Sequence, residues 1–200
     1  MRIDDRRAAE TAVEIVRRHG RAGDVPKLPQ GLYATLPQHA DVFFPELLHY
    51  LDVPKLGFSI AALALSFAST TQLEPGILEP FAEQLLALYA KRRTMLVPAQ
   101  RPTGTAWQWE ASYNRQRWQA GILLDLLGHV AAPAVEVELR RALAEYSDAR
   151  LRMNAALSLL RLDADVDAGA VAEIAANAES RKWLFDGLQK LERFHLYPMS

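Results

Sequence analysis

The sequence has no cysteine among its 200 residues. This absence excludes disulfide bonds, thiolate metal sites and cysteine nucleophiles. The sequence also lacks an excess of either charge, because 23 Lys and Arg residues are balanced by 24 Asp and Glu residues for a net charge of −1. Proteins that bind nucleic acid generally carry a basic excess, since neutralisation of phosphates supplies most of their affinity. Nucleic acid is therefore not expected as a partner, although a local basic surface remains open.

Long apolar runs are missing as well. The longest, FSIAALALSFA from Phe58 to Ala68, is shorter than the roughly 20 residues that a membrane helix needs. The beginning of the sequence, MRIDDRRAAE, is charged and has no apolar segment of the kind found in signal peptides. We expect a cytoplasmic protein with no membrane-spanning segment.

Motifs that carry catalysis or metal binding are also absent. There is no G-x-S-x-G, P-loop or G-x-G-x-x-G pattern, and the five histidines fall at no metal-ligand spacing. Asp163, Asp165 and Asp167 are spaced as in a calcium-binding loop, but Ala168 and Ile174 occupy the places where that loop needs Gly and Glu. Asp167 is better interpreted as a helix N-cap. We expect no metal site, no cofactor and no enzymatic activity.

Helical periodicity dominates what is present. Between its Gly and Pro residues the sequence shows the spacing of amphipathic helices and no convincing strand alternation. We predict an all-α protein with helices over residues 4–18, 45–51, 54–69, 75–96, 105–129, 133–146, 148–162, 167–178 and 180–195. The first helix would bury a stripe of Ala8, Ala12, Ile15 and Val16, and Pro45 would lie in the first turn of the second.

Two of these helices share a repeated pattern. RWQAGILLDLLG begins at Arg117 and RMNAALSLLRL begins at Arg152, and the two align at an offset of 35 residues through the arginine, a small pair and two leucines. A looser version begins at Arg181, and a fainter one without arginine begins at Phe58. These helices resemble the second helix of a HEAT-type repeat, with a spacing similar to that of short bacterial HEAT-like repeats.

The resemblance implies a right-handed α-solenoid of antiparallel helix pairs, that is, a HEAT-like superhelix. In that family the small pair lets the second helix lie close to the first helix of its own repeat. The arginine commonly pairs with an aspartate in the preceding turn, as Asp148 precedes Arg152, whereas no aspartate precedes Arg117 in this way. We expect one all-helical repeat domain over residues 1–200. It would have an N-terminal helix and irregular lead-in over 1–37 and about four helix pairs over 38–200, clearest in 105–195.

A helical wheel for residues 148–162 places Arg152 inside the apolar stripe, beside Ala155 and Ala156, where it should be partly buried. The opposite side holds Arg150, Asn154, Ser158 and Arg161, and we expect Arg150 and Arg161 to face water. The competing frame would bury Asn154 in the tight small-residue position. We reject it, because an unpaired buried amide is costly.

Three of the four tryptophans fall in AWQWEASYNRQRW, residues 106–118. On the wheel Trp109 and Tyr113 share the core face, so we expect them to fill space in the interior. Trp118 lies on a polar flank, where it could pack against the next repeat or contact a ligand.

The second helices of a HEAT-like solenoid line its concave surface. Carrying the exposed wheel positions across predicts a mixed-charge groove whose partner-binding residues are Arg115, Trp118, Gln119, Asp125, Arg150, Asn154, Lys182, Trp183 and Asp186, with Ile122, Met153, Leu157 and Glu179 beside them. Aromatic and Arg side chains supply much of the energy at protein interfaces. We therefore expect a non-enzymatic scaffold, adaptor, regulator or inhibitor that binds another protein on this face; an ordinary solvated surface is the alternative.

Two further readings stay open. Trp118, Asp125 and Arg150 could imitate the Trp, Asp and Arg cleft of HEAT-like DNA glycosylases, although the near-zero net charge argues against an enzyme that needs a basic cleft.

The last predicted helix is apolar on more than one side. Either the tail folds back over it, or that surface meets another chain, including a second copy, or the natural protein continues.

Overall fold

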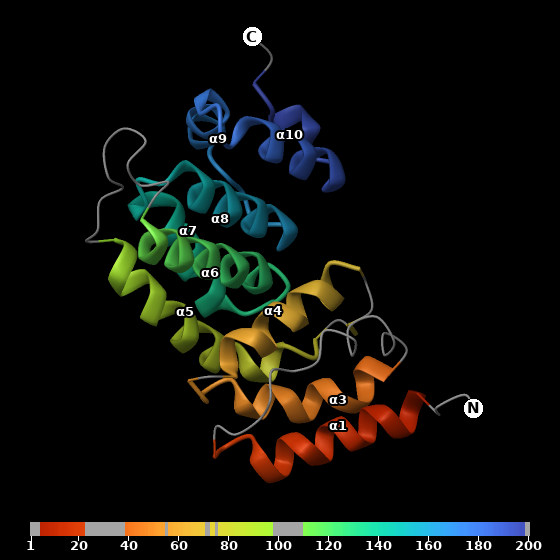
Figure 1. The fold of residues 1–200 in the computed structure, drawn as a ribbon. Coiled ribbons are helices and arrows are strands. Elements are labelled where there is room, and N and C mark those ends of the chain that lie inside the picture. The colour runs from red at the N-terminus through yellow and green to blue at the C-terminus, as the bar shows by residue number, and fades with distance from the viewer. Residues whose placement is uncertain are drawn as a thin grey trace. The chain divides into compact units, whose positions relative to one another are not determined.

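The computed structural model describes residues 5–22, 39–54, 56–70, 73–74, 76–97 and 110–198. Within these ranges every regular element is a helix and no strand occurs (Figure 1). The all-α prediction is therefore confirmed. The chain divides into two compact units, Met1–Leu88 and Tyr89–Ser200, and the boundary falls inside one helix, α5 (Ala82–Leu96).

The first unit has a core of aromatic side chains. Its elements are α1 (Asp5–His19), α3 (Ala40–Leu47), α4 (Gly57–Ala68), the start of α5, and the short 3-10 helices η2 (Leu48–Tyr50) and η3 (Glu79–Phe81). The ring of Phe67 meets those of Phe43 and Phe44 edge-on, with centroids 5.7 and 5.1 Å apart. Such tilted contacts add to the area that the rings bury.

Two details of this unit differ from the prediction. The buried stripe of α1 is Ala9, Val13 and Val16, whereas Ile15 is 43% exposed. The helix is therefore turned by about one residue from the predicted frame, because α3 packs on that side. Pro45 lies inside α3 and not in its first turn, since the helix already begins at Ala40.

The second unit contains the rest of α5 together with α6 (Ala111–Leu127), α7 (Pro133–Glu145), α8 (Ala149–Arg161), α9 (Ala168–Ala176) and α10 (Arg181–Lys190). Helix α8 packs against α6, α7, α9 and α10. Every residue from Leu151 to Leu160 is buried except Arg152, which is half-buried, as predicted. This central helix holds the unit together.

Helix starts in this unit follow their caps. The Asp148 carboxylate accepts hydrogen bonds from the backbone N–H groups of Arg150 and Leu151, and the Asp167 carboxylate accepts one from Ala170. The predicted N-cap at Asp167 is thus confirmed, and it satisfies donors that the first helical turn leaves unpaired. Helix α6 begins at Ala111, not at residue 105, because Glu110 has extended backbone. Trp107 and Trp109 lie outside the described residues.

The tail beyond α10 folds back onto it. Helix α10 ends at Lys190, earlier than predicted, and Glu192 adopts a left-handed backbone with φ 58° that redirects the chain. The 3-10 helix η5 (Phe194–Leu196) then packs on α10, where the ring of Phe185 meets those of Phe194 and Tyr197 at 5.1 and 5.3 Å. The folded-back tail, one of the three alternatives for this end of the sequence, is observed, and the structure does not test contact with another chain or continuation of the natural protein.

None of the helices described is long and apolar enough to cross a membrane.

Candidate functional site

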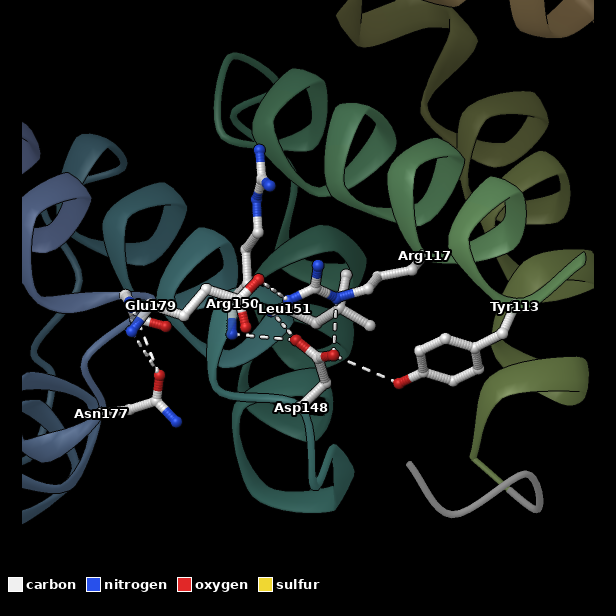
Figure 2. Close-up of polar contacts among 8 residues, drawn as sticks. Tyr113, Arg117, Asp148, Arg150, Leu151, Asn177 and Glu179 are labelled. Carbon is white, nitrogen blue, oxygen red and sulfur yellow. Dashed lines mark hydrogen bonds and ion pairs between the residues drawn. The ribbon is translucent and has the colours of Figure 1, made fainter. Parts of the chain in front are cut away.

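A buried carboxylate, Asp148, joins the beginnings of α6 and α8 (Figure 2). Its Oδ2 accepts hydrogen bonds from the Tyr113 hydroxyl at 3.1 Å and from Arg117 Nε at 2.6 Å. Its Oδ1 accepts the backbone N–H groups of Arg150 and Leu151 at 2.9 and 3.2 Å. Tyr113 is buried, as predicted. All four donors satisfy one carboxylate, so Asp148 is a structural anchor.

Arg117 extends this cluster to a third helix. Its Nη2 donates to Glu179 Oε1 at 2.6 Å, just before α10 begins. Asn177 accepts the Glu179 N–H at 3.0 Å and so fixes the turn that carries this carboxylate. Burial lowers the pKa of Arg117, but the hydrogen bonds and charges of Asp148 and Glu179 outweigh it and raise the pKa overall. The arginine therefore stays charged while buried.

This pairing corrects a prediction. Asp148 does not pair with Arg152 but with Arg117, which precedes it by 31 residues. Arg152 turns the other way, and its guanidinium donates to the Leu143 carbonyl at 3.1 Å and to Glu173 at 2.7 Å. The physical reason is that the Asp148 oxygens face α6 and the first turn of α8, which already supply their donors.

The seam between α6 and α8 corrects a second prediction. Asn154 and Ser158 are 7% and 0% exposed and do not face water. Asn154 Nδ2 donates to the Gly121 carbonyl at 3.1 Å, and Ser158 Oγ donates to the Leu124 carbonyl at 2.9 Å. Arg161 is half-buried and donates to the Asp125 carbonyl at 3.3 Å. Asn154 is buried but paired, so the cost of an unpaired amide does not arise.

Gly121 makes this close approach possible. A Cβ atom at this position would lie 2.9 Å from Asn154 Nδ2, closer than side-chain contacts allow. The small residue therefore lets α8 pack against α6, whereas the resemblance had placed the small pair against the first helix of its own repeat.

An open groove of about 310 Å³ is lined by residues of α6 and α8 beside this seam. Its lining residues are Asn114, Arg117, Trp118, Gly121, Ile122, Asp125, Arg150, Leu151 and Asn154. The structure thus brings Trp118, Asp125, Arg150 and Asn154 of the predicted surface into one groove. Trp118 is 57% exposed and forms part of its wall. Arg150 is exposed, and its side chain extends away from Asp148 (Figure 2).

The remaining predicted contact residues lie outside the groove lining. Arg115 is exposed on α6 and Gln119 is half-buried there. On α10, Trp183 is 58% exposed, and Lys182 Nζ pairs with Asp186 Oδ2 at 2.5 Å along the helix. Lys182, Trp183 and Asp186 thus belong to a separate helix, α10.

Helices α8 and α10 meet through another small residue. A Cβ atom at Gly187 would lie 2.5 Å from Leu157 Cδ1, so α10 turns this face toward α8. Trp183, one helical turn before Gly187, lies on the same face of α10. Met153 and Leu157 are 6% and 8% exposed, which corrects the prediction that they line the open surface.

Asp125 lines the groove and has a pKa that differs from its ordinary value. Burial raises its pKa to about 6, although Arg161 and then Arg150 act in the opposite direction. Asn154 Nδ2 is its side-chain donor, at 3.3 Å. One turn later, burial and the Arg161 charge lower the pKa of His129 to about 4, so His129 is neutral near pH 7.

Sequence reasoning missed Arg117 and Asp148 as partners, and it missed the buried role of Asn154. Both the Arg117–Asp148 contact and the Asn154 contact join residues on different helices that are 31 or more positions apart in the sequence. The repeat alignment of Arg117 with Arg152 singled out Arg117 in the sequence, and this alignment was the signal that could have pointed to the cluster.

In the described part of the chain, no cluster of three or more His, Asp or Glu side chains could hold a metal ion. Compared with protein-family models, curated proteins and solved structures, the chain matches none of them.

Proposed function

We propose that this protein is a non-enzymatic, HEAT-like interaction module of the cytoplasm that binds another protein on the surface formed by α6, α8 and α10. In this proposal the helices from α6 onward form a right-handed α-solenoid of antiparallel pairs, α7 with α8 and α9 with α10, with α6 as the second helix of the preceding pair. The close seams at Gly121 and Gly187 support this arrangement, because each lets successive second helices stack directly. The Arg117 contacts to Asp148 and Glu179 support it too, since they link three such helices in a row.

The observation that carries the binding function is the exposed indole of Trp118 at the edge of the groove. A tryptophan buries a large area when a partner covers it, and Trp and Arg are enriched among the residues that dominate protein interfaces. Trp118 is 57% exposed and lines the groove together with Arg150. Trp183, 58% exposed on the face of α10 that turns toward α8, would extend the same contact.

The test compares Trp118→Ala and Trp183→Ala with the wild-type protein. Both variants should keep the helical circular dichroism spectrum and lose less than about 1 kcal/mol of stability, because each ring is more than half exposed. Each should reduce capture of the partner from an extract of the native cells by about tenfold or more.

Val137→Ala is the matched control, since Val137 is 66% exposed on α7. It should leave capture unchanged. If both tryptophan variants unfold, the rings are part of the core and the binding surface is wrongly assigned.

A glycosylase-type enzyme is the second candidate. It is favoured by one observation, that Trp118, Asp125 and Arg150 line the same groove. The charge balance opposes it, because the net charge is −1 and the charge of Arg117 is taken up by two carboxylates. A titration with duplex DNA at low salt separates the two candidates, and absence of binding removes the enzyme.

A further inference from the structure

The carboxylates around the groove are mostly engaged within the protein. Asp148 accepts four hydrogen bonds, and Glu179 pairs with the buried guanidinium of Arg117. Farther along α10, Asp186 pairs with Lys182. Each of these carboxylates thus already faces a donor within the protein, although Arg117 with Asp148 and Glu179 together carries a net charge of −1.

Two arginines near the groove are not engaged in this way. Arg115 and Arg150 are both exposed, and within the described ranges neither side chain makes a hydrogen bond or an ion pair. Arg150 lines the groove itself. Arg115 precedes Trp118 by three residues on α6, so the two lie on the same side of that helix. The indole of Trp118 is thus accompanied by two positive charges that a partner can neutralise.

Asp125 is the one carboxylate among the described residues that line the groove. It lies about two helical turns beyond Trp118 and is half-buried beside Asn154. The charged groups whose fields reach it are Arg161 and Arg150 of α8, and His129, which follows the end of α6, is neutral near pH 7. Its desolvated site favours the protonated carboxyl more than water does.

We propose that the protein segment recognised by this groove is acidic: its carboxylates pair with Arg115 and Arg150, and an apolar side chain between them lies against Trp118 and Ile122 above Gly121. This inference rests on the proposed protein-binding function and names its partner chemistry. The volume of about 310 Å³ suits one large side chain of an extended segment. Nucleic acid is the poorer match, since two arginines in a chain of net charge −1 give few phosphate contacts.

Binding of an acidic segment should depend on pH. An acidic segment repels the Asp125 carboxylate, so its binding favours the protonated form and takes up a proton. Because the pKa of Asp125 is about 6, affinity should rise as the pH falls from 7.5 to 5.5. Glutamates of the segment stay ionised over this range, since their ordinary pKa is about 4.3. A basic segment would show the opposite dependence.

The experiment titrates the full chain with three probes while its ¹⁵N–¹H spectrum is recorded. The probes are an N-acetylated, C-amidated pentapeptide of sequence EEFEE, the corresponding peptide KKFKK, and a single-stranded DNA of twelve nucleotides. The indole signal of Trp118 is assigned with Trp118→Phe. We expect EEFEE alone to shift that signal, with Arg150→Glu and Arg115→Glu each weakening binding by about tenfold.

Two further variants sharpen the result. Lys190→Glu makes the same charge change at an exposed position at the end of α10 and should alter the affinity by less than about twofold. Asp125→Asn should tighten binding about threefold at pH 7.5 and remove the dependence on pH. Circular dichroism confirms that each variant is folded.

The outcomes separate the inference from the function on which it rests. Binding of KKFKK at Trp118 would overturn the acidic partner but leave the protein-binding function intact. Stronger binding of the DNA probe would overturn both and favour the second candidate. If no probe shifts Trp118, or if Lys190→Glu acts as strongly as Arg150→Glu, the acidic partner is wrong, and the capture experiment with Trp118→Ala decides the function by itself.

Discussion

Asp125 is a carboxylate held in a desolvated site. Its side-chain partner is the neutral amide of Asn154, and burial raises its pKa from 3.8 to about 6. The folded state thus binds the proton more tightly than the unfolded state does. Above pH 6 the charged form is present in both states and its burial opposes folding, whereas below the unfolded pKa of about 4 this penalty is absent.

We predict that Asp125→Asn stabilises the protein at pH 7.5 by about 1–3 kcal/mol, because the amide has nearly the same shape and carries no charge. The gain should shrink as the pH falls through 6 and vanish near pH 4. Urea denaturation of the wild type and the variant at pH 7.5, 6 and 4 measures it. A variant that is less stable than the wild type at pH 7.5 would show that the carboxylate makes a favourable contact in its charged form.

At this scale the sequence predicted some environments and missed others. The wheel correctly placed Tyr113 inside and Arg152 at partial burial, because both positions follow from the periodicity of their own helices. It failed for Asn154 and Ser158, which looked exposed because their side of α8 is polar. The periodicity of α8 alone does not reveal that α6, about 33 residues earlier in the sequence, presents backbone carbonyl groups to that polar side.

Two helices of the second unit begin with an aspartate cap, and the two caps differ in what else they do. Asp148 is 2% exposed and serves Tyr113 and Arg117 as well as the start of α8. Asp167 is exposed and accepts a single backbone hydrogen bond, from Ala170, at the start of α9. The pair separates the capping effect from the effect of the buried cluster.

We predict that Asp148→Ala destabilises the protein by about 3–5 kcal/mol, because it leaves the buried guanidinium of Arg117 without one of its two carboxylates. Asp167→Ala should cost only about 1 kcal/mol, the usual value of an N-cap. Chemical denaturation of both variants gives the comparison. Equal losses would mean that Arg117 is stabilised without Asp148 and that the cluster is not a structural anchor.

Element boundaries were predictable where the chain supplies its own signals. Helices α7, α8 and α9 begin within one residue of their predicted starts, since Pro133, Asp148 and Asp167 mark them. The start of α6 was missed, because the periodicity runs on through residues 105–110 and no capping residue stops it. The early start of α3 was missed because Pro45 looked like a first-turn residue, although the interior of this short helix tolerates it.

At the scale of the whole molecule, the periodicity of the sequence was enough to predict an all-α chain, since helical spacing recurs between nearly all of its Gly and Pro residues. The repeat pattern at Arg117 and Arg152 identified the two helices that form the groove. What it could not supply was their mutual packing, because Arg117 pairs with a carboxylate of the following helix and α8 turns its polar face to α6. The candidate site is therefore partly predicted, with Trp118, Asp125 and Arg150 in one groove but Lys182 and Asp186 outside it.

The central claim is that a partner protein contacts the groove between α6 and α8. Its most direct test is site-specific photo-crosslinking in an extract of the native cells, with benzoylphenylalanine replacing Trp118 in one protein and Val137 in another. Both positions carry exposed large hydrophobic side chains, but only position 118 lines the groove. The account predicts a discrete protein adduct from position 118 and none from position 137. An adduct from position 137 with none from position 118 would contradict it.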